Sequence, residues 1–246
     1  AGIITTEGFR DVLEMRRRDR PSTWGLWGQF TPVIERKCRL EVPERTLANG
    51  TVVKDVDEAS IKAAAQELIA QGCDSVCLFF INGYANTDNE IKAARILRQV
   101  WPNDYVSVAT EILPEIREFE RCSTASLNAY LQPVVANYLA RLETRIAKDE
   151  AGSEILIVQS NGGIMSVDTA KALPVRTALS GPAAGVVAAR QIAKAAGFEN
   201  VITCDMGGTS FDVSLVADGQ NMLTSQASID FGMVIRTPMI EMSTIG

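Results

Sequence analysis

The pattern of apolar and polar residues along the chain predicts strands that alternate with helices. A continuous apolar run at 75–81 is typical of a strand buried on both faces. A helix is expected before it, from Asp57 as the N-cap to about Gln71, and another after it over 88–100. With a further strand at 105–108, this β-α-β order indicates a three-layer α/β domain with parallel strands.

The longest helical pattern covers residues 123–148. Its apolar residues recur at intervals of three and four, which predicts one buried face, and Pro133 predicts a kink or a break. We therefore expect three parts: a first α/β region with an aromatic loop and a hairpin at 1–110, a long connecting helix at 111–150, and a second α/β region at 151–246 that carries the glycine motif described below.

Two segments of the first part allow more than one interpretation. Glu118, Glu120 and Arg121 stand before the long helical pattern, where they either cap and solvate the start of the helix or line a cleft between domains. The aromatic loop at 21–32 could bind a ligand, although packing onto the body of the protein is the simpler interpretation.

The most informative stretch is a glycine turn between two strands. Apolar, β-branched residues precede the turn at 200–204 and alternating residues follow it at 213–216, which predicts a strand, a turn and a second strand. The Gly-Gly-Thr-Ser sequence of the turn offers backbone N–H groups and two hydroxyls, a combination that holds phosphate oxygens. Asp205 and Asp212 flank the turn, so their carboxylates can hold Mg²⁺ through its waters or orient a water molecule.

A simpler interpretation of this stretch is a β-hairpin whose glycines only turn the chain. The full pattern Asp-x-Gly-Gly-Thr-Ser-x-Asp-Val is much narrower than a glycine pair. It resembles the second phosphate motif of the actin, sugar kinase and Hsp70 ATPase superfamily. We therefore favour a site for a nucleotide.

Two further segments could contribute to such a site. The polar residues 159–163 follow an apolar run at 154–158, interpreted as a buried strand, and ligands of open α/β sheets bind at that end of a strand. A plain turn is the alternative. A helix rich in Ala and Gly is expected from Ser180, as the capping residue, to about Ala196, and its N-terminus would present free N–H groups to an anion.

Composition argues against several other classes of function. The net charge of −6 and the pI near 4.9 argue against nucleic acid or an anionic membrane as the main partner. The chain has no histidine, which excludes Ser-His and Cys-His catalysis and histidine-bearing zinc sites within it. Its five scattered cysteines are typical of buried free thiols in a reducing cytosol. No run of about 18 apolar residues is present, so we expect a cytoplasmic protein without a membrane span.

Several runs, spread over nearly the full length in the expected order, resemble the hydantoinase A/oxoprolinase family. They are Gly8–Val12, Val42–Arg45, Arg117–Thr124, Asn128–Pro133, Gln159–Gly163, Ser180–Gly185 and Asp205–Ser210. The family includes ATP-dependent N-methylhydantoinases, 5-oxoprolinases and caprolactamase, and the related acetone and acetophenone carboxylase subunits.

The resemblance implies an actin-like ATPase fold of the ribonuclease H-like type, with a three-layer mixed sheet flanked by helices. It also implies that ATP phosphorylates the carbonyl or amide oxygen of a cyclic amide, which a hydantoinase B-type subunit or domain then hydrolyses, so we expect a hetero-oligomer. Asp205 and Asp212 would serve Mg²⁺ and catalysis. The residues that would bind the nucleotide are Gly207, Gly208, Thr209 and Ser210, with Gly181 as a weaker candidate.

The sequence departs from the family pattern at both ends. The family's earlier Asp-x-Gly-Gly-Thr phosphate loop should precede Ala1, and its glycine-rich adenosine stretch should follow Gly246. We therefore expect a central piece of a longer subunit, incomplete at both ends, that turns over no ATP alone. Two alternatives to cyclic-amide hydrolysis stay open: ATP-dependent carboxylation of acetone or acetophenone, and a nucleotide-binding module that catalyses nothing.

Overall fold

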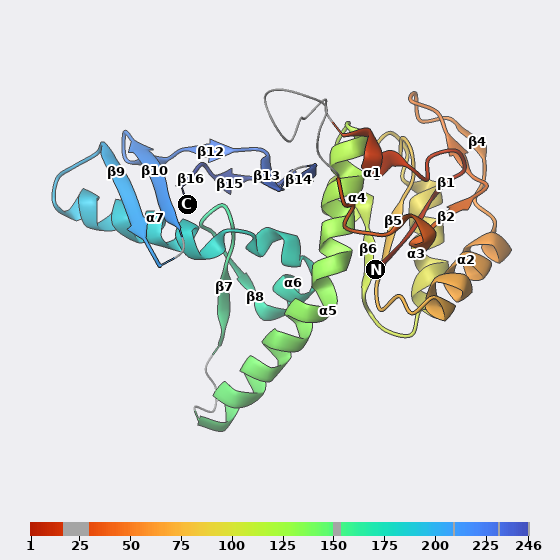
Figure 1. The fold of residues 1–246 in the computed structure, drawn as a ribbon, viewed down its shortest axis with the longest axis horizontal. Coiled ribbons are helices and arrows are strands. Elements are labelled where there is room, and N and C mark those ends of the chain that lie inside the picture. Colours follow the sequence, from red (N-terminus) through yellow and green to blue (C-terminus); the bar gives the residue numbers. More distant parts are fainter. Residues whose placement is uncertain (17–29, 150–153, 209, 231, 246) are drawn as a thin grey trace. The chain divides into compact units, whose positions relative to one another are not determined.

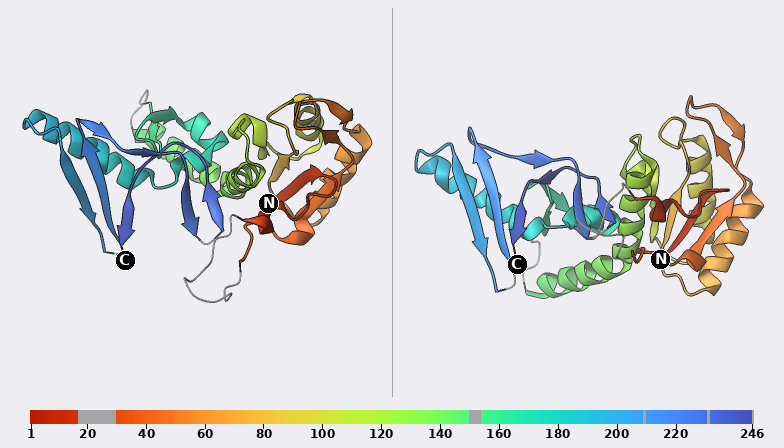
Figure 2. Two further views of the ribbon diagram at one scale, coloured as in Figure 1. Left: turned by 90° about the horizontal axis from the view of Figure 1, so that it is seen from above. Right: turned by 45° about the horizontal axis from the view of Figure 1, so that its top comes forward.

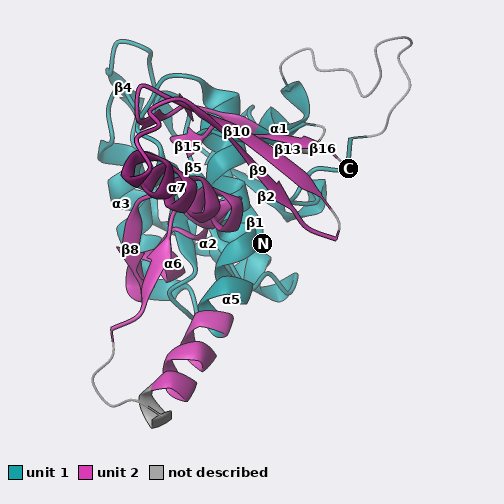
Figure 3. Ribbon diagram, turned by 90° about the vertical axis from the view of Figure 1, so that its left-hand side faces the viewer, with its two compact units in different colours: residues 1–137, 228–236 teal, residues 138–227, 237–246 magenta. Residues whose placement is uncertain are grey.

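The chain forms two compact units in a computed structural model that describes residues 1–16, 30–149, 154–208, 210–230 and 232–245. Unit 1 contains residues 1–137 and 228–236, and unit 2 contains residues 138–227 and 237–246 (Figure 3). The first boundary between the units lies within the long helix α5 (Glu118–Asp149). The division into three functional regions that the sequence suggested stays a prediction.

Unit 1 is built on a parallel sheet of four strands in the order β2-β1-β5-β6 (Figure 1). The strands are β1 (Gly2–Thr6), β2 (Arg39–Val42), β5 (Val76–Phe79) and β6 (Val106–Val108). Every residue of β5 is buried, as its continuous apolar sequence predicts. Figure 1 shows the sheet between helix α5 on one side and helices α2 and α3 on the other.

The helices of unit 1 follow local sequence signals closely. Helix α2 (Glu58–Ala70) begins after Asp57, whose side chain accepts a hydrogen bond from the Ser60 N–H at 2.9 Å, and it ends before Gly72 at φ +80°. Helix α3 (Asp88–Val100) has the predicted bounds. The smaller elements are α1 (Val12–Met15), a 3-10 helix (Arg36–Cys38), the hairpin of β3 (Arg45–Thr46) and β4 (Val52–Lys54), and α4 (Ala109–Ile112).

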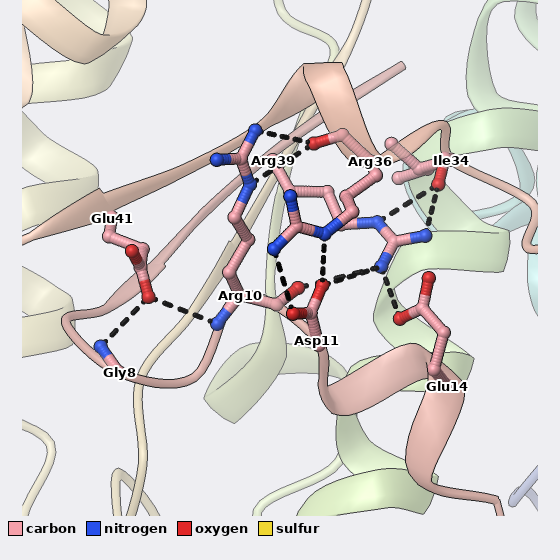
Figure 4. Close-up of polar contacts among 8 residues, drawn as sticks. All are labelled: Gly8, Arg10, Asp11, Glu14, Ile34, Arg36, Arg39 and Glu41. Carbon is pink, nitrogen blue, oxygen red and sulfur yellow. Dashed lines mark hydrogen bonds and ion pairs between the residues drawn. The ribbon is translucent and has the colours of Figure 1, made fainter.

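A cluster of arginines and carboxylates fixes the segment that follows β1 (Figure 4). Arg39 is fully buried, and it donates to the carbonyl oxygen of Ile34 at 3.0 and 2.8 Å and to the carboxylate of Glu14. Arg36 donates to both oxygens of Asp11, at 2.8 and 3.0 Å. Such paired hydrogen bonds hold a guanidinium in one orientation, so the cluster ties α1 to the start of β2.

Helix α5 runs without a break through Pro133, so the predicted break is wrong. A proline has no N–H to donate to the carbonyl four residues earlier, which here belongs to Ala129. The buried hydroxyl of Ser75 donates to that carbonyl oxygen at 2.6 Å. A side chain of unit 1 thus replaces the missing helix hydrogen bond.

The apolar residues predicted to form one buried face of α5 are divided between the core and the surface. Leu127 and Leu139 are buried, whereas Tyr130, Val134 and Tyr138 are exposed. The prediction of a single apolar face is therefore wrong in part. Polar residues take some of the buried positions: Asn128 donates to the Ser107 hydroxyl at 2.9 Å, and that hydroxyl donates to Gln132 at 3.1 Å.

The charged residues at 118–121 belong to the first turns of α5 and are mostly buried. Glu120 and Arg121 are almost or fully inaccessible. Arg121 donates to the carbonyl oxygens of Phe80 at 3.2 Å and Leu113 at 3.4 Å, and to Glu118 at 2.7 Å. Both interpretations from the sequence are therefore wrong for Arg121, which joins the helix to the end of β5.

Unit 2 has a small sheet with one long helix against it (Figure 2). The central strand of this sheet is β10 (Phe211–Ala217). Three strands pair with it, all antiparallel: β9 (Val201–Met206), β11 (Gln220–Asn221) and β16 (Ser243–Ile245). Helix α7 (Ser180–Ala195) lies against β9 and β10.

The remaining elements of the chain are short. They are β7 (Leu156–Val158), β8 (Ile164–Ser166), α6 (Val167–Ala172), a 3-10 helix (Pro174–Thr177), β12 (Leu223–Thr224), β13 (Ala227–Asp230), β14 (Met233–Ile235) and β15 (Met239–Ile240). The described residues contain no helix that is long and apolar enough to cross a membrane.

Candidate functional site

The strand, turn and strand predicted around the two glycines are confirmed. Strand β9 ends at Met206 and β10 begins at Phe211, and the Gly207 N–H donates to the Ser210 carbonyl oxygen at 3.0 Å to close the turn between them. Gly208 is exposed, and a Cβ atom added there would meet nothing within 4 Å. Thr209, the remaining predicted phosphate-binding residue of the turn, lies outside the described residues.

Asp205 and Asp212 lie directly opposite each other in the antiparallel pair β9–β10. Residues in register project to the same face of a sheet, so the two carboxylates share one face. Like charges at opposed positions are unfavourable unless something between them compensates the charge. Asp205 is exposed and Asp212 half-buried, which leaves room for a cation and its waters.

The shared face is the one that α7 covers. Val201 and Val216 also lie opposite each other in this strand pair. Each is four residues from one of the two aspartates, so its side chain is on the same face of the sheet. Val216 packs in a buried cluster with Ala183 of α7. The carboxylates therefore point to the helix side. A Cβ atom added to Gly185 of α7 would lie 3.7 Å from the Asp205 carboxylate, so a small residue at this position keeps the approach to Asp205 open.

The two carboxylates differ in their hydrogen bonds. The Thr244 hydroxyl of β16 donates to Oδ1 of Asp212 at 2.6 Å, and the Ser210 hydroxyl donates to Oδ2 at 3.3 Å. Within the described part of the chain, the Asp205 side chain has neither a hydrogen bond nor an ion pair. Sequence reasoning missed Thr244, because only the register of β16 places it beside Asp212.

A pocket of about 680 Å³ opens between α7 and the strands. Asp205, Asp212 and Ser214 line it on the sheet side, and apolar residues of α7 such as Val186 and Ile192 line it on the helix side. Its volume lies in the range of small-molecule sites. The carboxylates thus face a cavity with a polar end and an apolar remainder.

The start of α7 differs from the sequence expectation in one respect. Ser180 is the first helical residue rather than the cap, which is Leu179 in a left-handed conformation at φ 58°, and no side chain caps the helix. Gly181 is exposed and lies one helical turn before Gly185, on the same side of the helix. The predicted role of Gly181 in nucleotide binding stays a prediction.

Residues 159–163 form a turn, and their predicted contribution to a ligand site stays a prediction. They connect β7 and β8, an antiparallel pair, with the Gln159 N–H donating to the Gly163 carbonyl oxygen at 2.8 Å. The strand before them is not buried as predicted, since Leu156 is 48% exposed. The reason is that β7 pairs only with β8 among the described strands, and not with a larger sheet.

Four of the five cysteines are buried free thiols, as predicted, but Cys204 is exposed. It precedes Asp205 in β9, on a strand whose residues 204–206 are all exposed. The prediction that all cysteines are buried is therefore wrong for this one.

The donor set around the turn fits Mg²⁺ bound together with a nucleotide. Magnesium usually keeps several waters and takes one or two carboxylates plus phosphate oxygens. Asp205 and Asp212 supply such a pair, whereas no group of three or more His, Cys, Asp or Glu side chains among the described residues could hold a metal ion. The turn therefore suits a magnesium–phosphate complex better than a closed protein cage.

Family models match both parts of the chain. Residues 121–246 match the hydantoinase/oxoprolinase model, and residues 1–101 match the model of the hydantoinase/oxoprolinase N-terminal region.

Curated relatives match the chain over most of its length. The caprolactamase subunit alpha of Pseudomonas jessenii is 31% identical over 100% of this chain and 36% of its own length. The 5-oxoprolinase of Saccharomyces cerevisiae is 31% identical over 99% of this chain and 21% of its own length. The acetone carboxylase beta subunit of Xanthobacter autotrophicus is 27% identical over 87% of this chain and 30% of its own length. The chain thus spans about a third or less of each of these three relatives.

Two solved structures share the fold. The ATP-dependent caprolactamase from Pseudomonas jessenii superposes with a TM-score of 0.83 at 29% identity, over 100% of this chain and 36% of that chain. A nucleotide-free acetone carboxylase superposes with a TM-score of 0.84 at 24% identity, over the same shares. The predicted actin-like ATPase fold class is confirmed.

Proposed function

The chain belongs to the hydantoinase/oxoprolinase family, and we propose that it is part of an ATP-dependent subunit that activates a cyclic amide for hydrolysis. One observation carries this proposal: Asp205 and Asp212 face each other beside an open glycine turn. A glycine turn with an open position at Gly208, next to two carboxylates, suits a nucleotide phosphate with its Mg²⁺.

Each part of the site has a role in this proposal. The turn residues Gly207, Gly208, Thr209 and Ser210 hold phosphate oxygens, while Gly181 at the start of α7 contributes to the nucleotide side. Asp205 and Asp212 hold the metal ion and orient the phosphate. When bound, Mg²⁺ supplies positive charge that offsets the negative charge of the phosphates.

The reaction proposed is phosphoryl transfer followed by hydrolysis. The amide or carbonyl oxygen of the substrate attacks the γ-phosphorus of ATP, an oxygen–phosphorus bond forms, and the bond to the ADP oxygen breaks. The phosphorylated carbon is a better electrophile than the original amide. A water molecule then attacks that carbon, the ring opens and phosphate is released. This hydrolysis takes place on a hydantoinase B-type partner. The names of relatives, an ATP-dependent caprolactamase and a 5-oxoprolinase, support this reaction class.

Ketone carboxylation is the second candidate. Relatives named as an acetone carboxylase beta subunit and an acetophenone carboxylase gamma subunit are 27% and 28% identical to the chain. Activation of a carbonyl oxygen by ATP would use the same turn and the same carboxylates. The residues around the turn therefore support the activation step, and the choice of substrate falls to experiment.

The test measures Mg-ATP hydrolysis by the natural protein that contains this chain, together with its partner. The substrates are hydantoin, 5-oxoproline, caprolactam, and acetone or acetophenone with bicarbonate. Stimulation by one cyclic amide, lost on Asp205→Ala, is the expected result. Stimulation by a ketone would replace hydrolysis with carboxylation. Binding of ATP without stimulation by any substrate would overturn the proposal in favour of a module that catalyses nothing.

A further inference from the structure

We propose that Thr244 is a positioning residue that acts through Asp212 and makes the two carboxylates of the site unequal. In this arrangement Asp212 is held in place by hydroxyl groups, and Asp205 is the carboxylate that is free to turn toward the cation and its waters. The inference rests on the proposed function, because it assigns roles within the same site.

The sheet register brings Thr244 to Asp212. Strand β16 pairs antiparallel with β10, and Thr244 is the register partner of Asp212, just as Asp205 is its partner on β9. The three residues therefore form a row across three strands, with Asp212 in the middle. A residue 32 positions away in the sequence becomes the direct neighbour of a site carboxylate.

The hydrogen bonds occupy both oxygens of Asp212. The Thr244 hydroxyl donates to Oδ1 at 2.6 Å, at the short end of the range for O–H···O hydrogen bonds. The Ser210 hydroxyl donates to Oδ2 at 3.3 Å, which is longer and weaker. Thr244 therefore provides the stronger of the two restraints on the orientation of Asp212.

Asp205 has the opposite environment. Its side chain is exposed, has no hydrogen bond or ion pair in the described part of the chain, and lies beside the open position of Gly185. Rotation of Asp205 toward a ligand breaks no hydrogen bond or ion pair with the residues that the structure describes. Rotation of Asp212 would break the bond to Thr244. The fixed carboxylate thus sets the position of the negative charge, and the free one adapts to the ligand.

Loss of the Thr244 hydroxyl should weaken metal binding rather than nucleotide binding. Without the restraint, Asp212 can turn away from Asp205 to relieve their repulsion, and the cation then meets one carboxylate at a time. We therefore expect the dissociation constant of the metal to rise by about tenfold.

The experiment compares Thr244→Val, which keeps the shape but lacks the hydroxyl, with Thr244→Ser, which keeps the hydroxyl. Mn²⁺ serves as the probe, and its binding to the natural protein with ATP present is measured by electron paramagnetic resonance. We expect Thr244→Val to weaken Mn²⁺ binding about tenfold, Thr244→Ser to stay near wild type, and the affinity for metal-free ATP to stay unchanged in both.

Ser243→Ala, at the neighbouring position of β16, controls for general damage to the strand, and circular dichroism checks folding. If Thr244→Val does not fold, Thr244→Ala and Thr244→Ser provide the same comparison. The inference would be overturned if Thr244→Val bound Mn²⁺ as tightly as wild type. It would also be overturned if Thr244→Val and Thr244→Ser lost the same amount of affinity.

Asp205→Asn distinguishes the proposed site from the role of Thr244 within it. Unchanged Mn²⁺ binding in that variant would contradict the proposed site itself, whereas a loss there with none in Thr244→Val would contradict the role of Thr244 alone.

Discussion

The hydroxyl of Ser75, just before β5, donates a hydrogen bond at 2.6 Å to the carbonyl oxygen of Ala129 in helix α5. Pro133 leaves that carbonyl without its usual helix donor. The proline is therefore tolerated in the middle of a long helix because the neighbouring layer supplies the missing hydrogen.

Replacing Ser75 with alanine should destabilise unit 1. The Ala129 carbonyl would be left without a donor in a buried place, which costs about 1–3 kcal/mol. The free energy of unfolding, measured with urea, should fall by that amount. In a second background, Pro133→Ala restores the N–H of residue 133, so Ser75→Ala should cost clearly less there. Equal costs in both backgrounds would contradict the compensation.

Glu44 should make stability depend on pH. Its carboxyl is buried and accepts hydrogen bonds from Thr6 and, at 2.9 Å, from Asn89, and burial raises its pKa above the ordinary value of 4.5. The folded state therefore favours the protonated acid. The contribution to stability is fully present below pH 4.5 and is lost as the pH rises toward the folded pKa.

Glu44→Gln mimics the protonated acid and should remove this dependence. Urea unfolding of the variant and the wild type at a series of pH values tests it. The variant should gain stability relative to wild type as the pH rises from 4.5 to neutral. Glu67→Gln, at an exposed position of α2, is the matched control for the loss of one carboxylate. A constant difference for Glu44→Gln, or one of opposite sign, would show that burial does not favour the protonated form.

Two glycines of unit 2 should respond in opposite ways to alanine. Gly162 has φ +81°, and a Cβ atom there would lie 2.6 Å from the Val187 side chain, so Gly162→Ala should lower the free energy of unfolding by about 1–3 kcal/mol. Gly185 is inside helix α7, and among the described residues outside the helix backbone a Cβ atom there would meet the Asp205 carboxylate at 3.7 Å. Gly185→Ala should therefore raise stability by about 0.5–1 kcal/mol. Unfolding curves of both variants check this, and a loss for both would mean that space around Gly185 is tighter than described.

The sequence predicted those elements whose signals are local. The bounds of α3 and the cap at Asp57 come from residues within a few positions, and so does the turn between Asp205 and Asp212. Some predictions that needed knowledge of the surroundings failed. The strand at 154–158 was expected to be buried from its apolar composition, but its burial depends on which strands pair with it.

The same distinction applies to the candidate site. Both aspartates could be singled out because they flank a glycine pair within eight residues of sequence. Thr244 could not, because its contact with Asp212 arises from the register of β16. Gly185 carries a weak signal, its spacing of four from Gly181, but only the packing of α7 on the sheet places it beside Asp205.

The most direct test of the account measures ATP affinity by calorimetry, with and without Mg²⁺, in the natural protein that contains this chain and in Asp205→Asn. Asp218→Asn, which removes the same charge at an exposed turn of unit 2, is the matched control. We predict that Mg²⁺ tightens ATP binding in wild type and in the control, and that this gain falls by about tenfold or more in Asp205→Asn. An equal effect of Mg²⁺ in all three proteins would contradict the assignment of the glycine turn as the magnesium–nucleotide site.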